Sequence, residues 1–187
     1  MKKKITILFS VTLALALTFV AFVNVQADAI PGIAGGGQIV QAPEGAKRPE
    51  WSVISFGGWA QGPQVGPGTG EWQINYHNVS LSTLDKATFH STDITDINYF
   101  VGNSGTCNSA LNMTMYGSLN GMPGYKVIFR AGDFGSPGYV DTVRVELYSP
   151  DGAKVFDTHG SEFVDQSSCV GSARTGLDAG NVTIVLP

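Results

Sequence analysis

Thr142-Val-Arg-Val-Glu-Leu-Tyr148 alternates apolar and polar side chains at every second position, and Tyr125-Lys-Val-Ile-Phe-Arg-Ala131 follows nearly the same rule. A period of two is that of a half-buried β-strand, because successive side chains point to opposite faces of a sheet. Between the two stretches, Asp133-Phe-Gly-Ser-Pro-Gly-Tyr-Val-Asp141 supplies turn residues, and Ser149-Pro-Asp-Gly152 makes a second turn. The segment from Tyr125 to Asp157 is therefore predicted to fold as three strands joined by two turns.

The same alternation recurs on both sides of this unit. No window of a dozen residues beyond the first 29 has the i, i+3, i+4, i+7 spacing of an amphipathic helix. The sequence thus contains eight or nine predicted short strands separated by Gly, Pro, Asn and Asp turns. This pattern is typical of antiparallel β-sandwiches and β-barrels. We expect an antiparallel β-sandwich of the jelly-roll or immunoglobulin-like type, with a closed barrel as the alternative. The other predicted strands cover residues 51–56, 72–77, 87–90, 97–101, 111–116 and 181–186.

Residues 1–29 have the organisation of a signal peptide. Lys2 to Lys4 form a basic start, Ile5 to Val23 is uncharged and apolar, and Ala27-Asp-Ala29 offers the small residues that a signal peptidase requires. Because the apolar run of 19 residues is longer than most signal-peptide cores, an uncleaved N-terminal anchor is the alternative. Cleavage predicts bacterial export and a secreted or extracellular chain, in solution or associated with the cell surface.

The remaining 158 residues are enough for one domain with its own core. Residues 30–49 are rich in Gly, Pro and Ala and lack a hydrophobic period, so they are predicted to be a flexible arm. Within it, Gln38-Ile-Val40 is the one apolar piece able to pair as an edge strand, at home or in a neighbouring subunit, which leaves self-assembly open. Residues 50–187 are predicted to form the single β-sandwich domain.

The charge of the chain excludes one class of partner. The net charge is −4 for the full sequence and −6 without the first 29 residues, which hold three lysines and one aspartate. Nucleic acids and anionic membranes are bound through basic surfaces. We therefore expect no nucleic acid partner and, once the leader is cleaved, no membrane partner.

Cys107 and Cys169 are the two cysteines of the chain. In an exported protein an even number of cysteines predicts a disulfide, and linking positions 62 apart would stabilise the fold by about 4 kcal/mol in the chain-entropy model. Two free thiols or a metal-binding pair are the alternatives, although neither cysteine has a histidine or cysteine at metal-ligand spacing.

Three motifs resemble those of the bacterial secreted domains called post-COAP. They are Gly58-Trp59, then Phe129-Arg-Ala-Gly-Asp-Phe-Gly-Ser-Pro-Gly-Tyr-Val-Asp141, and the terminal Thr175-Gly-Leu-Asp-Ala-Gly-Asn181. The resemblance covers residues 56 to 186 and rests largely on turn residues; the spacing of the Phe and Asp in the second motif is one residue shorter than in the family pattern. It implies an all-β extracellular domain of unestablished activity, and so concerns fold and location rather than chemistry.

Asp133 and Asp141 flank the Gly-Ser-Pro-Gly turn, where their carboxylates and nearby carbonyl groups would offer the hard oxygen ligands that Ca²⁺ prefers. The spacing is not that of an EF-hand loop. The alternative is that each aspartate accepts hydrogen bonds from backbone N–H groups and holds the turn. No other cofactor is predicted.

Aromatic side chains are the candidate ligand contacts. Trp59 and Tyr139 are the two rings predicted to bind a ligand, Tyr139 because it lies in the acidic turn. Trp51, Trp59 and Trp72 all occupy strand positions, where core packing is the alternative. An extracellular glycan or a protein surface is the expected partner.

The sequence contains no recognisable catalytic motif. Its three histidines belong to no zinc-protease motif, and no Gly-x-Ser-x-Gly elbow occurs. Glu71, Glu146 and Glu162 are the acids able to pair as in a glycoside hydrolase. We predict a secreted or cell-surface module with a non-catalytic binding or structural role. A carbohydrate-binding module is the first alternative, and a small extracellular hydrolase is the second.

Overall fold

The computed structural model describes residues 30–41, 52–79, 84–104, 107–134, 141–158, 175–177 and 179–186. Every regular element among these residues is a β-strand, which confirms the all-β prediction. The described residues include no helix long and apolar enough to cross a membrane. The ten strands are β1 (Gly32–Gln41), β2 (Ser52–Gln61), β3 (Val65–His77), β4 (Thr88–Ser104), β5 (Cys107–Leu119), β6 (Met122–Asp133), β7 (Thr142–Tyr148), β8 (Lys154–Asp157), β9 (Thr175–Gly176) and β10 (Ala179–Val185).

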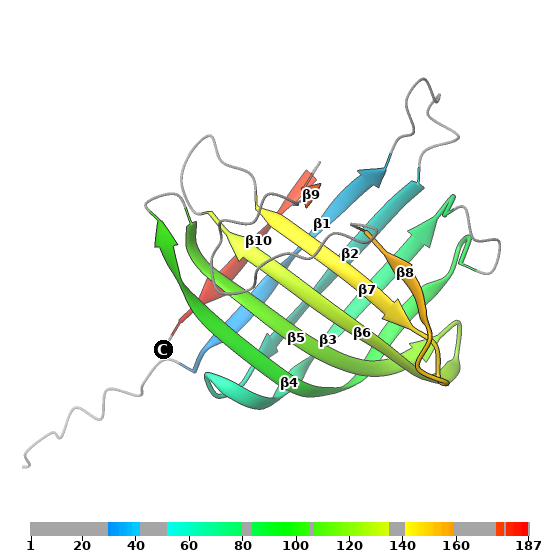
Figure 1. Cartoon of the computed structure of the whole chain (residues 1–187), viewed down its shortest axis with the longest axis horizontal. Helices are drawn as coiled ribbons and strands as arrows, with labels where there is room; N and C mark the ends of the chain where they lie inside the picture. The colour runs from blue at the N-terminus through cyan, green and yellow to red at the C-terminus, as the bar shows by residue number, and fades with distance from the viewer. Residues whose placement is uncertain are drawn as a thin grey trace, which may run out of the picture.

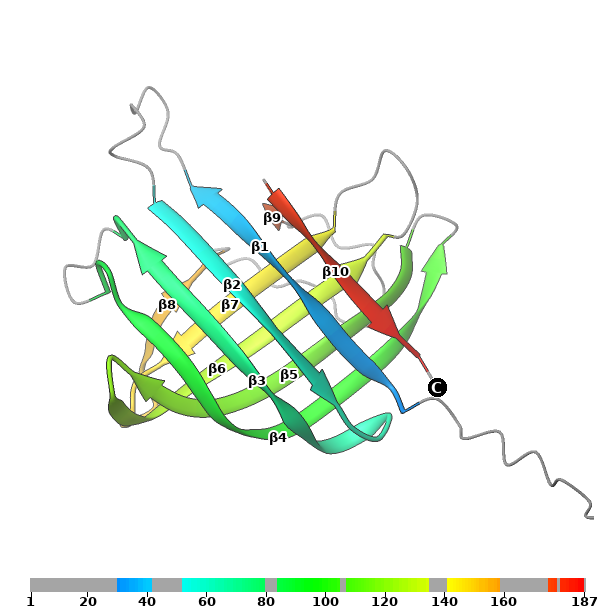
Figure 2. The ribbon, with the colours of Figure 1, turned by 180° about the vertical axis from the view of Figure 1, so that it is seen from behind.

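The strands form one antiparallel sheet that curls into a half-barrel (Figure 1). Its order is β10-β1-β2-β3-β4-β5-β6-β7-β8, with β9 paired to β7, so each strand from β1 to β8 lies beside the next one in the chain. Figure 2 shows β10, β1 and β2 in front of β6 and β7, as two walls that face each other. The antiparallel prediction is confirmed. The two separate sheets and crossover connections of a jelly-roll or immunoglobulin-like sandwich are not seen among the described strands.

Long, bulged strands explain how one sheet encloses the core. β4 has 17 residues and combines the predicted segments 87–90 and 97–101 in one strand. Its pairing with β5 shifts register between Ser91 and Asp93 and again between Ile94 and Asp96. Such bulges bend a strand and increase its twist, and they also interrupt the period-two alternation. The alternation therefore predicted two short strands where the chain forms one curved strand.

The prediction of a flexible arm over residues 30–49 is wrong for residues 32–41. These residues form β1, of which residues 32–38 pair with β10 and residues 32–41 pair with β2. In the predicted edge piece, Gln38 therefore lies between two strands, and Ile39 and Val40 pair with β2 of the same chain. Ile33 and Ile39 are buried. The glycines are required by close packing: a Cβ on Gly35 would lie 2.3 Å from the backbone oxygen of Asn181 on β10. The sequence suggested a linker because glycine has no side chain with which to mark a strand.

An aromatic cluster fills the interior between the walls. The centroid of the Trp72 ring lies 4.7 Å from that of Phe129 and 6.1 Å from that of Phe56. This cluster joins β2 and β3 of one wall to β6 of the other. The apolar side chains of the alternating stretch on β7 are also buried, as predicted: Val143, Val145 and Leu147.

Carboxylates connect β10 to the ends of β6 and β7. β10 pairs with β1 along one edge, and N–H groups of its other edge donate to the two aspartates that flank the segment between β6 and β7. Val182 N donates to Asp141 Oδ2 at 2.8 Å, and Ile184 N donates to Asp133 Oδ2 at 3.0 Å. The other carboxylate oxygen of Asp141 accepts the N–H of Phe134 at 3.0 Å. The aspartate oxygens thus accept hydrogen bonds from N–H groups of β10 that would otherwise need the carbonyl groups of a neighbouring strand.

Replacing Ile39 with alanine tests whether β1 belongs to the core. Ile39 is fully buried, so we expect I39A to lose about 2–5 kcal/mol of unfolding free energy. Gln38 is exposed on the opposite face, and Gln38→Ala should stay within about 0.5 kcal/mol of the wild type. Urea unfolding followed by tryptophan fluorescence measures both variants. Equal stability of the two would mean that residues 32–41 are an arm after all.

Asp141→Asn tests the connection to β10. The amide nitrogen of asparagine accepts no hydrogen bond, so one of the two N–H groups on Asp141 would lose its partner, at a cost of about 1–3 kcal/mol. Asp96 is exposed on β4, and Asp96→Asn makes the same change of charge as a control. Thermal unfolding compares the two. If D141N melts at the same temperature as the wild type, the carboxylate of Asp141 does not hold β10.

Candidate functional site

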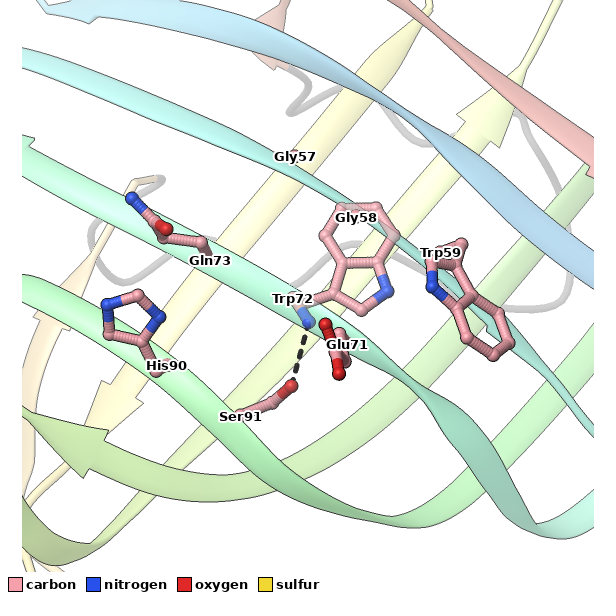
Figure 3. Close-up of a pocket in the computed structure, with 8 residues that line it drawn as sticks. All are labelled: Gly57, Gly58, Trp59, Glu71, Trp72, Gln73, His90 and Ser91. Atoms are coloured by element: carbon pink, nitrogen blue, oxygen red, sulfur yellow. Dashed lines mark hydrogen bonds between the residues drawn. The ribbon is translucent and has the colours of Figure 1, made fainter.

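A hollow of about 470 Å³ lies over β2, β3 and β4, on the outer face of the sheet (Figure 3). An indole, a carboxylate, an amide and an imidazole surround it. In Figure 3, Trp59 and His90 stand at opposite ends, with Glu71 between them. The residues that line the hollow are Gly57, Gly58, Trp59, Glu71, Trp72, Gln73, His90 and Ser91.

Strand register brings these side chains together. Trp59 on β2 is paired with Glu71 on β3. Two residues further along β3, Gln73 lies between Gly57 on β2 and His90 on β4. Because side chains alternate between faces, these positions all present their side chains on the outside, away from the core.

Missing side chains make this part of the sheet concave. Gly57 places no side chain beside Gln73. Gly58 has no room for one, since a Cβ there would lie 2.1 Å from the backbone oxygen of Glu71. The backbones of β2 and β3 therefore approach closely and form the base of the hollow between the taller side chains around it.

An irregularity between β3 and β4 shapes the other side of the hollow. The pairing of these strands shifts register between Gly68 and Gln73. In this interval the backbone N–H of Trp72 donates to the side-chain oxygen of Ser91 at 2.8 Å. Ser91 thus satisfies a backbone donor where the ladder is interrupted, and it fixes the distance between the two strands.

The exposed groups of the hollow suit binding by hydrogen bonds and ring contact. Trp59 is 46 % exposed, and Glu71, Gln73 and His90 are exposed as well. The amide of Gln73 donates to Asn75 Oδ1 at 2.9 Å, which holds its orientation. Among the described residues that line the hollow there is no lysine or arginine, and Glu71 is the one acid.

The acids considered for glycoside hydrolysis are not brought together. Two carboxyl groups about 5–10 Å apart are needed for that chemistry. Glu162 lies outside the described residues, and among those that the structure describes Glu71 is the only acid that lines the hollow. Glu146 is on β7, four strands away, where Arg130 Nη1 at 3.0 Å and Arg144 Nη2 at 2.8 Å neutralise it. The hollow therefore offers groups for binding but not a pair of carboxylates.

The structure also locates the other predicted site residues. Trp72 packs in the core, whereas Trp59 lies on the outer face. Tyr139 and Trp51 lie outside the described residues, as does Cys169. Cys107 begins β5, but its side chain is not among those described, so the disulfide stays a prediction.

The sequence left two roles open for Asp133 and Asp141, binding of Ca²⁺ or acceptance of backbone hydrogen bonds. In the structure both side chains make the contacts of the second role. Both carboxylates accept backbone N–H groups of β10, and Asp141 accepts one from Phe134 as well. Among the described residues no group of three or more His, Cys, Asp or Glu is placed to hold a metal ion.

Sequence reasoning missed Gln73 and His90 as site residues and considered Glu71 only as half of a hydrolase pair. Alternation along 72–77 already placed Gln73 on the polar face of its strand. The signal that was lacking is the pairing of β3 with β2 and β4, which joins residues up to 33 positions apart in the chain.

Comparison with protein-family models, curated proteins and solved structures gave no match.

We expect the melting temperature of the wild-type protein to be the same in EDTA and in millimolar Ca²⁺, because backbone N–H groups already occupy the aspartates. Differential scanning calorimetry of metal-free protein, with and without added Ca²⁺, measures it. A melting temperature that rises with Ca²⁺ and does not rise in D141N would support the calcium site instead.

Proposed function

We propose that the chain is a non-catalytic binding module, secreted or held at the cell surface, and that the hollow beside Trp59 is its ligand site. The observation that carries the proposal is an indole left 46 % exposed at the rim of a concave, polar surface. Ligand sites combine concave shape and apolar contact with a few directed polar groups.

The exposure of Trp59 has an energetic meaning. Burial of apolar surface contributes roughly 25 cal/mol per Å². Trp72, which points to the other face of the same wall, gains this contribution in the core, where it is 2 % exposed. The register of β2 holds Trp59 in water instead. Its ring gains the corresponding free energy only when a ligand covers it.

Carbohydrate is the ligand class that these groups favour. The C–H face of a sugar ring packs on an indole, and sugar hydroxyls can donate to Glu71 and exchange hydrogen bonds with Gln73 and His90. Phosphate and sulfate groups are usually held by arginine and lysine, and neither occurs among the described residues that line the hollow. This combination supports the carbohydrate-binding alternative over binding of an anionic ligand.

Export supports the same proposal. The basic start, the apolar run and Ala27-Asp-Ala29 are those of an exported chain, and the resemblance to post-COAP domains implies an extracellular location. We propose further that the two facing walls act as the two layers of a flattened sandwich. The hollow would then lie on the outside of one rigid layer, open to an extracellular ligand.

Trp59→Ala tests the proposed site. We expect a glycan array to identify bound saccharides for the wild type, and W59A to bind them at least about ten-fold more weakly, since it loses the ring contact. Tyr116 is another exposed aromatic residue, on β5, and Tyr116→Ala should bind as the wild type does. Isothermal titration calorimetry gives the affinities. A blank array, or full binding by W59A, would refute the site.

A further inference from the structure

A second hollow, of about 250 Å³, lies on the other side of Trp59, over β10, β1 and β2. Its lining is mainly apolar and includes two side chains that are largely in water, Ile30 at 63 % exposed and Val185 at 48 %. Trp59 lines both hollows, so its indole stands between the first hollow, which is polar, and the second, which is apolar. A ligand that covers the whole ring must therefore reach beyond the first hollow.

The wall that holds this second hollow has no charged residues. β10, β1 and β2 contain 7, 10 and 10 residues without one Asp, Glu, Lys, Arg or His, although 14 % of the chain is charged. Figure 2 shows the three strands side by side at the front of the molecule. Exposed sheet faces ordinarily carry charges for solubility. Their absence here indicates a surface suited to contact with an uncharged partner.

Register makes this wall continuous with the first hollow. Thr183, Ala34, Trp59 and Glu71 form one row across β10, β1, β2 and β3. The adjacent row on the same face contains two glycines at its centre. Because glycine has no side chain, the surface of the sheet is recessed there. The members of this row, in strand order, are Asn181, Gly36, Gly57, Gln73 and His90.

We infer that the ligand is a neutral polysaccharide that runs across the strands, from the hollow at His90, over Trp59, to the apolar hollow at Val185. This inference rests on the proposed function and specifies the ligand further. The two hollows together extend over five strands, β10 to β4, which is about 19 Å at ~4.8 Å per strand. A track of that length accommodates several sugar rings of a chain rather than one sugar.

The chemistry of the wall selects an uncharged polymer. A carboxylate or sulfate laid on β10 and β1 would lose water and meet no cationic side chain there, which is a costly desolvation. Hydroxyl groups find uncharged partners instead. Gln61, Asn181 and Thr183 are exposed on this wall and both donate and accept hydrogen bonds.

The area of the wall argues against a second copy of the chain as its occupant. Three strands of seven to ten residues, each about 4.8 Å wide, cover roughly 14 Å by 23–33 Å, or about 320–460 Å². A stable protein–protein interface buries about 800 Å² per partner. A linear polymer one ring wide requires no more surface than the wall supplies.

Affinity electrophoresis with polymers that share one backbone tests the inference. Hydroxyethylcellulose and xyloglucan are neutral and carboxymethylcellulose is anionic, and all three have a β-1,4-glucan backbone. Neutral galactomannan and dextran extend the panel to other backbones. We expect the wild type to be retarded by at least one neutral polymer and not by carboxymethylcellulose. Stronger binding to the anionic polymer, or binding to short oligosaccharides alone, would overturn the inference while leaving the site at Trp59 in place.

A charge placed on the wall separates this inference from the proposed function. Thr183→Asp should weaken binding to the neutral polymer at least about ten-fold with an unchanged melting temperature. Thr95 is exposed on β4 outside both hollows, and Thr95→Asp should bind as the wild type does. If W59A loses binding and T183D keeps it, the ligand ends at Trp59 and the inference is wrong.

Two further outcomes assign the wall to another occupant. Sedimentation of the wild type with neutral phosphatidylcholine vesicles, abolished in T183D, would make it a lipid contact. A dimer in analytical ultracentrifugation that becomes monomeric in T183D would make it a self-association surface. Either result overturns the inference, and absence of binding to every saccharide overturns the proposed function as well.

Discussion

Two aspartate carboxylates hold β10, and the wall formed by β10, β1 and β2 depends on that contact. Asp141 and Asp133 accept the N–H groups of Val182 and Ile184, and so join β10 to the ends of β6 and β7. β10 in turn supports β1, which supports β2 and Trp59. Without these oxygens, buried donors on the outer edge of β10 would lack partners, which is a larger penalty than the net gain of most hydrogen bonds. In the sequence these two aspartates suggested a calcium site. Their contacts show that aspartates which accept backbone hydrogen bonds can have the same sequence pattern as metal ligands.

Glycine determines where the sheet can be concave and where it can pack closely. Gly35 admits the backbone of β10, and Gly58 admits that of β3. Between these close approaches, Gly36 and Gly57 leave a low row on the outer face, beside the indole of Trp59. The curvature of the sheet and the hollow on its outer face thus have one cause, since a strand that lacks side chains bends easily and leaves space above it. Close packing of backbones is thus why a glycine-rich segment, interpreted from the sequence as a linker, forms β1 between β10 and β2.

The candidate site could be predicted in part. Trp59 was identified from its residue type alone, and alternation placed Gln73 on a polar face. The other residues of the hollow could not be found in this way, because Glu71 and His90 join Trp59 in its lining only through the β2–β3 and β3–β4 pairings. The charge-free wall is likewise visible only when β10, from the end of the chain, is placed beside β1 near its start. Glu146 is a further example, because the sequence suggested it only as half of a hydrolase pair, whereas three cationic side chains surround it in the structure.

The sequence by itself determined that the chain forms antiparallel strands and which face of β7 enters the core, because the alternation of side chains is a local property of two-residue period. Only the tertiary structure decided that these strands form one curled sheet, since bulges in β4 and the carboxylates that hold β10 act between residues far apart in the chain. It also decided which wall carries no charge and where Trp59 stands on it. The physical reason is that these features depend on which residues of neighbouring strands are paired. That register is fixed by the whole sheet and cannot be identified from one segment of sequence alone.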